Sequence, residues 1–294
     1  MSNPRMATTS SFSLPGPSGA PLDGLLDLPE HGSGPWPAVV ICHGFKGFME
    51  WGFFPYLAAL LADRGFAAVR FNLSGSGMRP GEDRVADPAA FRANTHSAEL
   101  ADLLAVMAAT GREIAPGQVD MARLGLLGHS RGGGAAVLAA ARPEWRERVR
   151  VLVTWAAVAS FDRYTPEQKE IWRRDGELAV ENTRTGQRLA LGLELLTDLE
   201  EHAGELDVTA AASRVRTPWL IVHGEEDESV PVADAHRLDA AANASVKDLL
   251  LIPGAGHTFG SRHPFAGPTP HLIQALNATQ LWFRRHLRGA AELG

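Results

Sequence analysis

Residues 123–134 read RLGLLGHSRGGG, an apolar run that changes abruptly into a glycine-rich segment. The first six residues are typical of a buried strand, and the Ala- and Gly-rich residues 131–142 are typical of a helix. Between the two stands Ser130, with Gly128 two residues before it and Gly132 two residues after it. A sharp G-x-S-x-G turn of this kind lifts the serine Oγ above the edge of a sheet, and small residues are needed because the chain folds back on itself. Ser130 is therefore a candidate nucleophile, and a glycine-rich turn without chemistry is the alternative interpretation.

Apolar runs with the composition of buried strands recur on both sides of this motif. They are AVVIC (38–42), FAAVRF (66–71), VRVLVTW (149–155), WLIVHG (219–224) and VKDLLLI (246–252). Helical patterns occur at 53–65, 95–111, 131–142, 231–242 and 269–288. Continuous apolar runs suit strands that are buried on both faces, as in a parallel sheet. The alternation of strand and helix predicts an α/β fold with a mostly parallel central sheet and helices on both faces.

One long segment interrupts this alternation. About sixty residues separate the strand at 149–155 from the strand at 219–224, which is longer than an ordinary crossover. Within it, residues 161–193 contain a helical pattern followed by two alternating runs joined by a Gly-containing turn. We predict a small cap at 161–193, inserted into a single domain that covers 11–294. Residues 1–10 are expected to form a flexible N-terminus.

Composition excludes several classes of function. The chain of 294 residues has a formal net charge of −6, which argues against a nucleic-acid partner because such proteins carry a basic face. Its single cysteine, Cys42, excludes an intrachain disulfide and a cysteine-based zinc site. The polar start MSNPRMATTS and the lack of a long apolar run predict no signal peptide and no membrane association. A cytoplasmic location is the expectation that follows.

A serine nucleophile needs a general base and an acid that orients the base, and in this architecture they follow the serine in the order acid, then histidine. Asp227 lies in the loop after the strand at 219–224, and His257 lies in the Gly-rich loop after the strand at 246–252. These two residues are the predicted partners of Ser130. Competing acids are Glu225, Glu226 and Glu228, and competing histidines are His263 and His271. Asp227 is preferred over the glutamates because a helix begins soon after it at Val230-Pro231, which leaves the acid in the short loop before the helix. His257 is preferred because the competing histidines lie farther from the end of the strand. The remaining histidines are expected mostly at the surface or in turns, and His96 is expected at the N-terminal end of a helix rather than as a ligand.

Stabilising the oxyanion of an acyl transfer requires two backbone N–H groups. One is expected from Arg131, which follows the nucleophile, and the other from Phe45, in the loop HGFKG (43–47) after the strand at 38–42. Several aromatic residues near the sheet edge are candidates for an apolar pocket, with core packing as the alternative for each. They are Phe45, Phe48, Trp51, Trp155, Phe161 and Phe259.

These four loops together resemble those of the α/β-hydrolase superfamily. The segments HGFKGFMEWGFFP (43–55), RFNLSGSG (70–77) and NTRTGQ (182–187) are similar to bacterial serine esterases related to cinnamoyl and feruloyl esterases and to dienelactone hydrolase. The resemblance implies hydrolysis of a small carboxylic ester through an acyl-enzyme, with Ser130, Asp227 and His257 as the catalytic residues and with no cofactor or metal. Dienelactone hydrolase has a cysteine at the elbow, so its lactone specificity is not carried over. A homodimer is possible.

The same residues admit other chemistry. A thioesterase, an amidase or a short-peptide hydrolase would use the same triad, and a binding protein could retain the fold without turnover. Haloalkane dehalogenases and epoxide hydrolases place an aspartate at the elbow, where this chain has Ser130.

Overall fold

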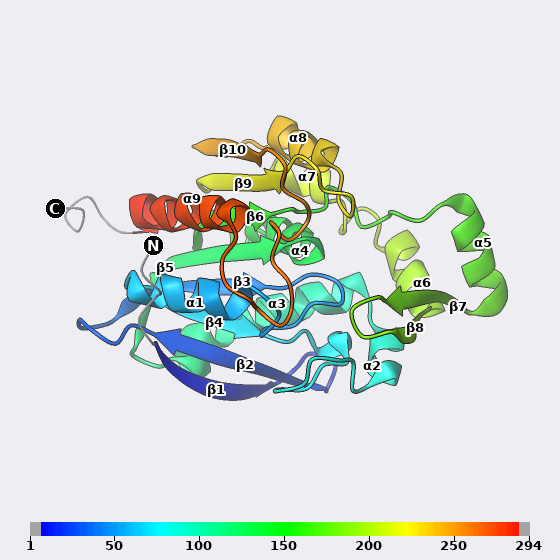
Figure 1. Cartoon of the computed structure of the whole chain (residues 1–294), viewed down its shortest axis with the longest axis horizontal. Coiled ribbons are helices and arrows are strands. Elements are labelled where there is room, and N and C mark those ends of the chain that lie inside the picture. The colour runs from blue at the N-terminus through cyan, green and yellow to red at the C-terminus, as the bar shows by residue number, and fades with distance from the viewer. Residues whose placement is uncertain (1–6, 288–294) are drawn as a thin grey trace.

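The computed structural model describes residues 7–287 and is built around one eight-stranded sheet (Figure 1). In spatial order the strands are β1 (Thr8–Pro15), β2 (Pro21–Leu28), β4 (Ala67–Phe71), β3 (Trp36–Cys42), β5 (Val119–His129), β6 (Val149–Trp155), β9 (Trp219–Gly224) and β10 (Lys247–Ile252). β1 pairs with β2 and β2 pairs with β4 in antiparallel fashion, and all other pairs are parallel. The predicted α/β fold with a mostly parallel sheet is confirmed.

Helices cover both faces of this sheet. Apolar residues from α3 (His96–Ala109), α4 (Arg131–Ala141), α7 (Val208–Ala212) and α8 (Val232–Ala241) pack on one face. Residues from α1 (Phe54–Asp63) and α9 (Pro270–Leu287) pack on the other. Successive residues of β3 alternate between the two cores, with Val40 and Cys42 in the first and Val39 and Ile41 in the second. This alternation explains why the strand is apolar throughout.

The N-terminal strand begins within the segment that the sequence predicted to be flexible. Residues 8–10, expected to be flexible, form the start of β1, because Thr8 to Pro15 pair in register with Leu28 back to Pro21. Their side chains are exposed on an edge strand, so no apolar alternation marks them as strand residues. Residues 1–6 of the expected flexible terminus, and residues 288–294 at the end of the expected domain, lie outside the described part of the chain.

The segment between β6 and β9 projects from one side of the sheet, at the right in Figure 1. It contains α5 (Pro166–Asp175), β7 (Glu177–Asn182), β8 (Gln187–Gly192) and α6 (Leu193–Glu201), and β7 and β8 form a separate antiparallel hairpin. Its small core contains Trp172 and Leu195 and also Phe91 of α2 (Pro88–Ala93). Helix α2 is not apparent from the sequence, because its six residues are too few to show helical periodicity.

All parallel strands end at the same edge of the sheet, so the loops after β3, β5, β9 and β10 meet there. The carboxyl edge of such a sheet is the usual place for a ligand site in open α/β folds. Within 7–287, no helix is both long enough and apolar enough to span a membrane.

Next to this edge, α3 holds the short helix η1 (Ser74–Ser76) through one buried carboxylate. Asp102 Oδ2 accepts the Ser74 N–H at 2.8 Å and its Oγ–H at 2.7 Å, while Oδ1 has no partner. Burial raises the pKa of Asp102 to about 6, and the hydrogen bonds from Ser74 only partly oppose this. Between about pH 4 and pH 6 the folded chain therefore retains a proton that the unfolded chain has released, so rising pH lowers the stability of the fold.

We expect Asp102→Asn, which keeps an acceptor for Ser74 and removes the charge, to abolish this pH dependence. Relative to the wild type, the variant should gain about 2 kcal/mol in free energy of unfolding between pH 4.5 and pH 7.5. Urea unfolding of both proteins at the two pH values measures the gain. A stability difference that stays constant with pH would show that Asp102 is not held near this pKa.

Candidate active site

Ser130 stands at a strained turn between β5 and α4. Its backbone has φ 58° and ψ −123°, outside the regions that non-glycine residues usually occupy, and its N–H donates to Trp155 O at 2.9 Å. A Cβ added at Gly128 would lie 2.2 Å from Gly132 O, and one added at Gly132 would lie 2.3 Å from His43 O. Both glycines of the motif are therefore required by close backbone packing.

The three residues predicted as a triad lie next to one another. His257 Nε2 is 3.0 Å from Ser130 Oγ, and His257 Nδ1 is 2.8 Å from Asp227 Oδ2. Because a carboxylate only accepts hydrogen bonds, Nδ1 carries the proton, and Nε2 is left to accept the Ser130 O–H. The loops after β5, β9 and β10 thus form a continuous hydrogen-bonded chain from carboxylate to hydroxyl.

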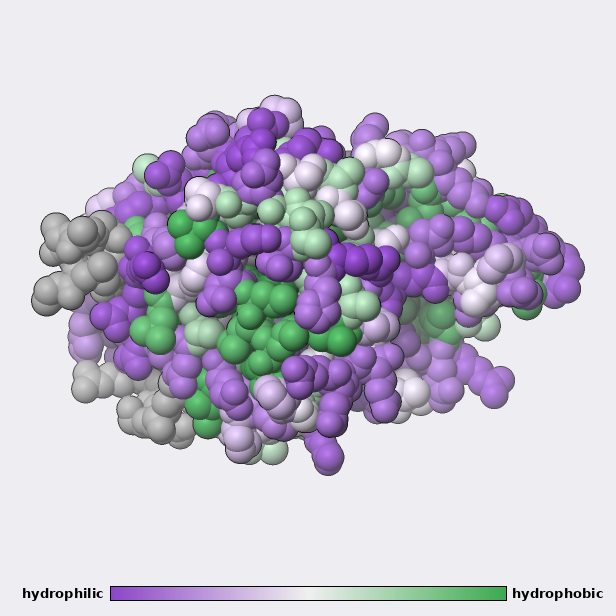
Figure 2. All heavy atoms as spheres, turned by 90° about the horizontal axis from the view of Figure 1, so that it is seen from above, coloured by the Kyte–Doolittle hydropathy of each residue, from purple (hydrophilic) through white to green (hydrophobic). Residues whose placement is uncertain are grey.

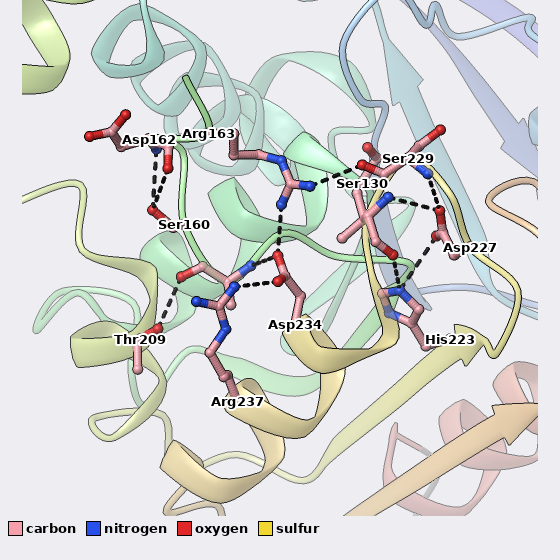
Figure 3. A network of polar contacts seen from close by, with 12 residues as sticks. Ser130, Ser160, Asp162, Arg163, Thr209, His223, Asp227, Ser229, Asp234 and Arg237 are labelled. Atoms are coloured by element: carbon pink, nitrogen blue, oxygen red, sulfur yellow. Dashed lines mark hydrogen bonds and ion pairs between the residues drawn. The ribbon is translucent and has the colours of Figure 1, made fainter. Parts of the chain in front are cut away.

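The Asp227 carboxylate is buried and held by several donors (Figure 3). Its Oδ1 accepts the N–H groups of Ser229 at 2.9 Å and Val230 at 2.8 Å, and His223 Nε2 lies 3.4 Å from Oδ2. Burial by itself disfavours the charged form, but the hydrogen bonds from His223, His257 and Val230 hold the pKa of Asp227 below its usual range. The carboxylate therefore stays ionised, as the orienting acid of an imidazole must.

The competing residues do not take part in this chain. Glu225, Glu226 and Glu228 are exposed, although they flank Asp227 in sequence. His263 Nδ1 accepts the Gly52 N–H at 3.1 Å, and His271 is the second residue of α9.

Four histidines have buried side chains, although most histidines outside the triad were expected at the surface or in turns: His43, His96, His129 and His223. His96 is also the first residue of α3, as expected. His129 Nε2 donates to His257 O at 3.1 Å, so this side chain fixes the backbone of the histidine that faces Ser130. Burial is the largest cause that lowers the pKa of His129 to about 3, so the ring stays neutral. The sequence positions of two of these buried histidines place them near the triad. His129 lies inside the G-x-S-x-G motif, and His223 lies four residues before Asp227 within an apolar strand.

The two predicted oxyanion donors belong to two segments that meet at Ser130, the start of α4 and the loop after β3. Arg131 is the first residue of α4, so its N–H has no acceptor within the helix. Phe45 lies in a tight turn closed by Gly47 N–H donating to Gly44 O at 3.0 Å, with Lys46 at φ 57°. A Cβ on Gly44 would lie 2.8 Å from Ser130 Cβ, so this turn touches the nucleophile's own backbone segment.

The side chain of His43 holds the same turn in place through two hydrogen bonds. Its Nε2 accepts the Leu73 N–H at 3.2 Å, which leaves the proton on Nδ1, and Nδ1 donates to Gly44 O at 2.9 Å. Burial lowers the pKa of His43, so this neutral tautomer persists.

A cavity of about 480 Å³ opens at Ser130 and His257 and extends to the cap. Of the aromatic candidates, Phe45, Trp51 and Phe161 line it. The other three, Phe48, Trp155 and Phe259, do not line the cavity and are buried. Within 7–287, no cluster of His, Cys, Asp and Glu has the arrangement of a metal site.

Comparison with known proteins places this geometry in context. The sequence pattern of the prolyl oligopeptidase family (Peptidase_S9) matches residues 51–288. An uncharacterized 31.7 kDa Escherichia coli protein from the traX-finO intergenic region is 26% identical over 282 residues, covering 85% of this chain and 91% of that protein.

Two solved structures share the fold. Est1E from Butyrivibrio proteoclasticus superposes with a TM-score of 0.68 and 22% identity, over 94% of this chain and 98% of that one. A puromycin-hydrolyzing peptidase from Mycobacterium tuberculosis gives a TM-score of 0.66 and 20% identity, over 96% of this chain and 39% of that one. At these identities the likeness establishes the fold alone.

Proposed function

The chain belongs to the prolyl oligopeptidase family of serine hydrolases, in the α/β-hydrolase superfamily, and we propose that it cleaves carboxylic esters through an acyl-enzyme on Ser130. The observation that carries the proposal is the continuous chain from Asp227 Oδ2 through His257 to Ser130 Oγ, with contacts of 2.8 and 3.0 Å. Both contacts are within the range that proton transfer by a general base requires.

In the first half-reaction, Ser130 Oγ attacks the ester carbonyl and His257 Nε2 takes its proton. The Asp227 carboxylate stabilises the imidazolium that forms. The tetrahedral intermediate then collapses, the C–O bond to the alcohol breaks, and the alcohol leaves with the proton from His257. In the second half-reaction, His257 deprotonates a water molecule, which attacks the acyl group and releases the acid and the free Ser130 hydroxyl.

The negative charge on the carbonyl oxygen needs donors that are in place before the reaction. The N–H groups of Phe45 and Arg131 are assigned this role, because one is held in a tight turn against the elbow and the other begins α4. A single donor of this type typically contributes about 3 kcal/mol of transition-state stabilisation.

A short-peptide hydrolase is the second candidate, and the family match favours it. The cavity wall argues against peptides whose free amino terminus enters the site, because the described residues that line it include Lys46, Arg163 and Arg184 and no Asp or Glu. An ammonium group would find no counter-ion there.

A matched pair of substrates separates the two candidates. We expect p-nitrophenyl butyrate to be cleaved with a much higher kcat/KM than butyryl p-nitroanilide, which has the same acyl group and an amide bond. Release of p-nitrophenol and p-nitroaniline is followed by absorbance. Because esters are intrinsically more reactive, an anilide rate equal to the ester rate would mean that the site serves amide leaving groups, and the ester assignment would be wrong.

A further inference from the structure

The wall of the cavity carries charge of one sign. Four of the residues lining it are cationic, and no carboxylate lines it within the described chain. They are Lys46, Arg131, Arg163 and Arg184. The overall charge of the chain is −6, so this local excess of cations runs against the composition of the protein.

Two of the four cations are neutralised by carboxylates of the surrounding structure. Arg131 Nη1 donates to Glu99 Oε1 at 3.0 Å, and both side chains are buried. Arg163 Nη1 donates to Asp234 Oδ2 at 2.8 Å, and its Nη2 donates to Ser229 O at 2.9 Å (Figure 3). These arginines tie the cap and the nucleophile helix to neighbouring elements and add little net charge to the cavity.

Lys46 and Arg184 have no such partner: no carboxylate lies within ion-pair distance of either among residues 7–287. Lys46 Nζ donates to a backbone oxygen, Glu181 O, at 2.6 Å. Arg184 Nη2 is buried with no hydrogen-bond acceptor, and its guanidinium stands 5.3 Å from the centroid of the Phe48 ring. Asp83 is the carboxylate that acts on Arg184, and it does so only at longer range.

Both cations are partly buried, and this burial lowers the pKa of each, that of Lys46 also through the nearby charge of Arg131. A buried polar group without a hydrogen-bond partner is energetically unfavourable, and an anion that supplied the missing acceptor would remove that penalty.

The two cations both line the cavity next to the cap hairpin. Lys46 contacts Glu181 near the end of β7, and Arg184 lies three residues later in the turn that leads to β8. Lys46 adjoins Phe45, so this end of the cap hairpin faces the side of the cavity next to the proposed oxyanion donors. Much of the face in Figure 2 is hydrophilic, so an exposed charge would be ordinary. What distinguishes Arg184 is that it lines the cavity while one of its guanidinium nitrogens, Nη2, is buried without a hydrogen-bond partner.

We propose that Lys46 and Arg184 form a subsite for a carboxylate of the substrate, so that the preferred substrates are esters that carry a free carboxylate. This inference rests on the proposed ester hydrolysis and names its substrate class. A guanidinium binds a carboxylate through two parallel N–H groups, and the lysine adds a second positive charge. The carboxylate belongs either to the acid part of the ester, as in a dicarboxylic monoester, or to the alcohol part.

Pairs of esters that differ only in charge test the subsite. Monoethyl adipate and ethyl 5-carbamoylpentanoate place a carboxylate or its neutral amide on the acid part. The esters 4-carboxyphenyl butyrate and 4-carbamoylphenyl butyrate place them on the alcohol part. We expect kcat/KM to be at least about tenfold higher for the carboxylate in one of the two pairs, which corresponds to about 1.4 kcal/mol.

Variants at Lys46 and Arg184 test whether these two cations cause the preference for the carboxylate ester. Lys46→Gln and Arg184→Gln should each lower the ratio of carboxylate to amide kcat/KM toward one. The matched control is Arg188→Gln, which removes the same charge from an exposed position of the same hairpin and should leave the ratio as in the wild type. Far-ultraviolet circular dichroism and the Tm show that each variant is folded.

The outcomes separate this inference from the proposed function. If the wild type cleaves the amide and carboxylate esters equally well, the proposed carboxylate subsite is wrong, while the proposed ester hydrolysis is supported. If the two variants slow both members of a pair by the same factor, the cations serve the oxyanion or the fold, and the subsite is again wrong. If no ester is cleaved, the proposed ester hydrolysis fails, but the subsite can still be tested by calorimetry of Ser130→Ala with monoethyl adipate and with ethyl 5-carbamoylpentanoate. Equal affinities for the two compounds would overturn the subsite.

Discussion

Replacing Ser130 with alanine is expected to lower kcat for p-nitrophenyl butyrate by about a millionfold, the typical cost of removing a serine nucleophile. The Ser130 hydroxyl donates to His257 Nε2 and is the nucleophile of the proposed acyl-enzyme. Stability should change little, by about 0.5 kcal/mol or less, because the side chain is partly exposed and buries no apolar surface. Steady-state kinetics and thermal unfolding measure the two quantities.

Ser160→Ala is the matched control for this prediction. Ser160 is also a partly exposed serine near the cap, and its Oγ hydrogen-bonds to the backbone of Asp162 in its own turn. The control should retain the wild-type kcat. Ser130→Ala that keeps substantial turnover with a wild-type Tm would show that the hydrolysis does not pass through Ser130.

Replacing Asp227 with asparagine is expected to lower kcat by about 10⁴-fold. The asparagine oxygen still accepts the N–H groups of Ser229 and Val230, which leaves the amide NH₂ facing His257 Nδ1. The imidazole must then accept at Nδ1 and carry its proton on Nε2, so it has no lone pair for the Ser130 proton. The KM for the ester should change much less than kcat.

Glu226→Gln and Glu228→Gln provide controls at the same loop. Both remove one negative charge within one residue of Asp227, and both side chains are exposed. They should keep kcat within a few-fold of the wild type. A loss of activity in either control equal to that of Asp227→Asn would place the orienting acid elsewhere in the loop.

Most of the sheet was predictable, because its strands are local patterns with a strong signal. Runs such as AVVIC are apolar at every position because both faces of β3 are covered. The elbow was predictable because close backbone packing leaves room only for glycine at 128 and 132. The loops of Asp227 and His257 were predictable because parallel strands end at one edge of the sheet.

Features that depend on partners distant in the sequence were not predictable. The strand at 8–10 depends on its pairing with β2, and α2 depends on Phe91 packing into the core of the cap. The buried state of His129 and His96 depends on aromatic rings from other elements, Phe53 and Phe161.

The aromatic candidates show the same limit. Phe45 and Phe48 stand three residues apart with the same hydrophobicity, yet the turn at 44–47 directs only the first into the cavity. Which face of a loop a side chain takes is set by tertiary packing, and hydrophobicity alone carries no information about it.

Reaction with a fluorophosphonate, followed by mass spectrometry of the intact chain and its peptides, tests most directly whether the three loops form a working hydrolase. Attack by an activated serine releases fluoride and leaves a phosphonate ester on that oxygen. The expected result is a single adduct on the peptide that contains Ser130, its absence in Ser130→Ala and its slow formation in Asp227→Asn. A wild-type chain that stays unmodified, or one labelled at a different serine, would contradict the assignment.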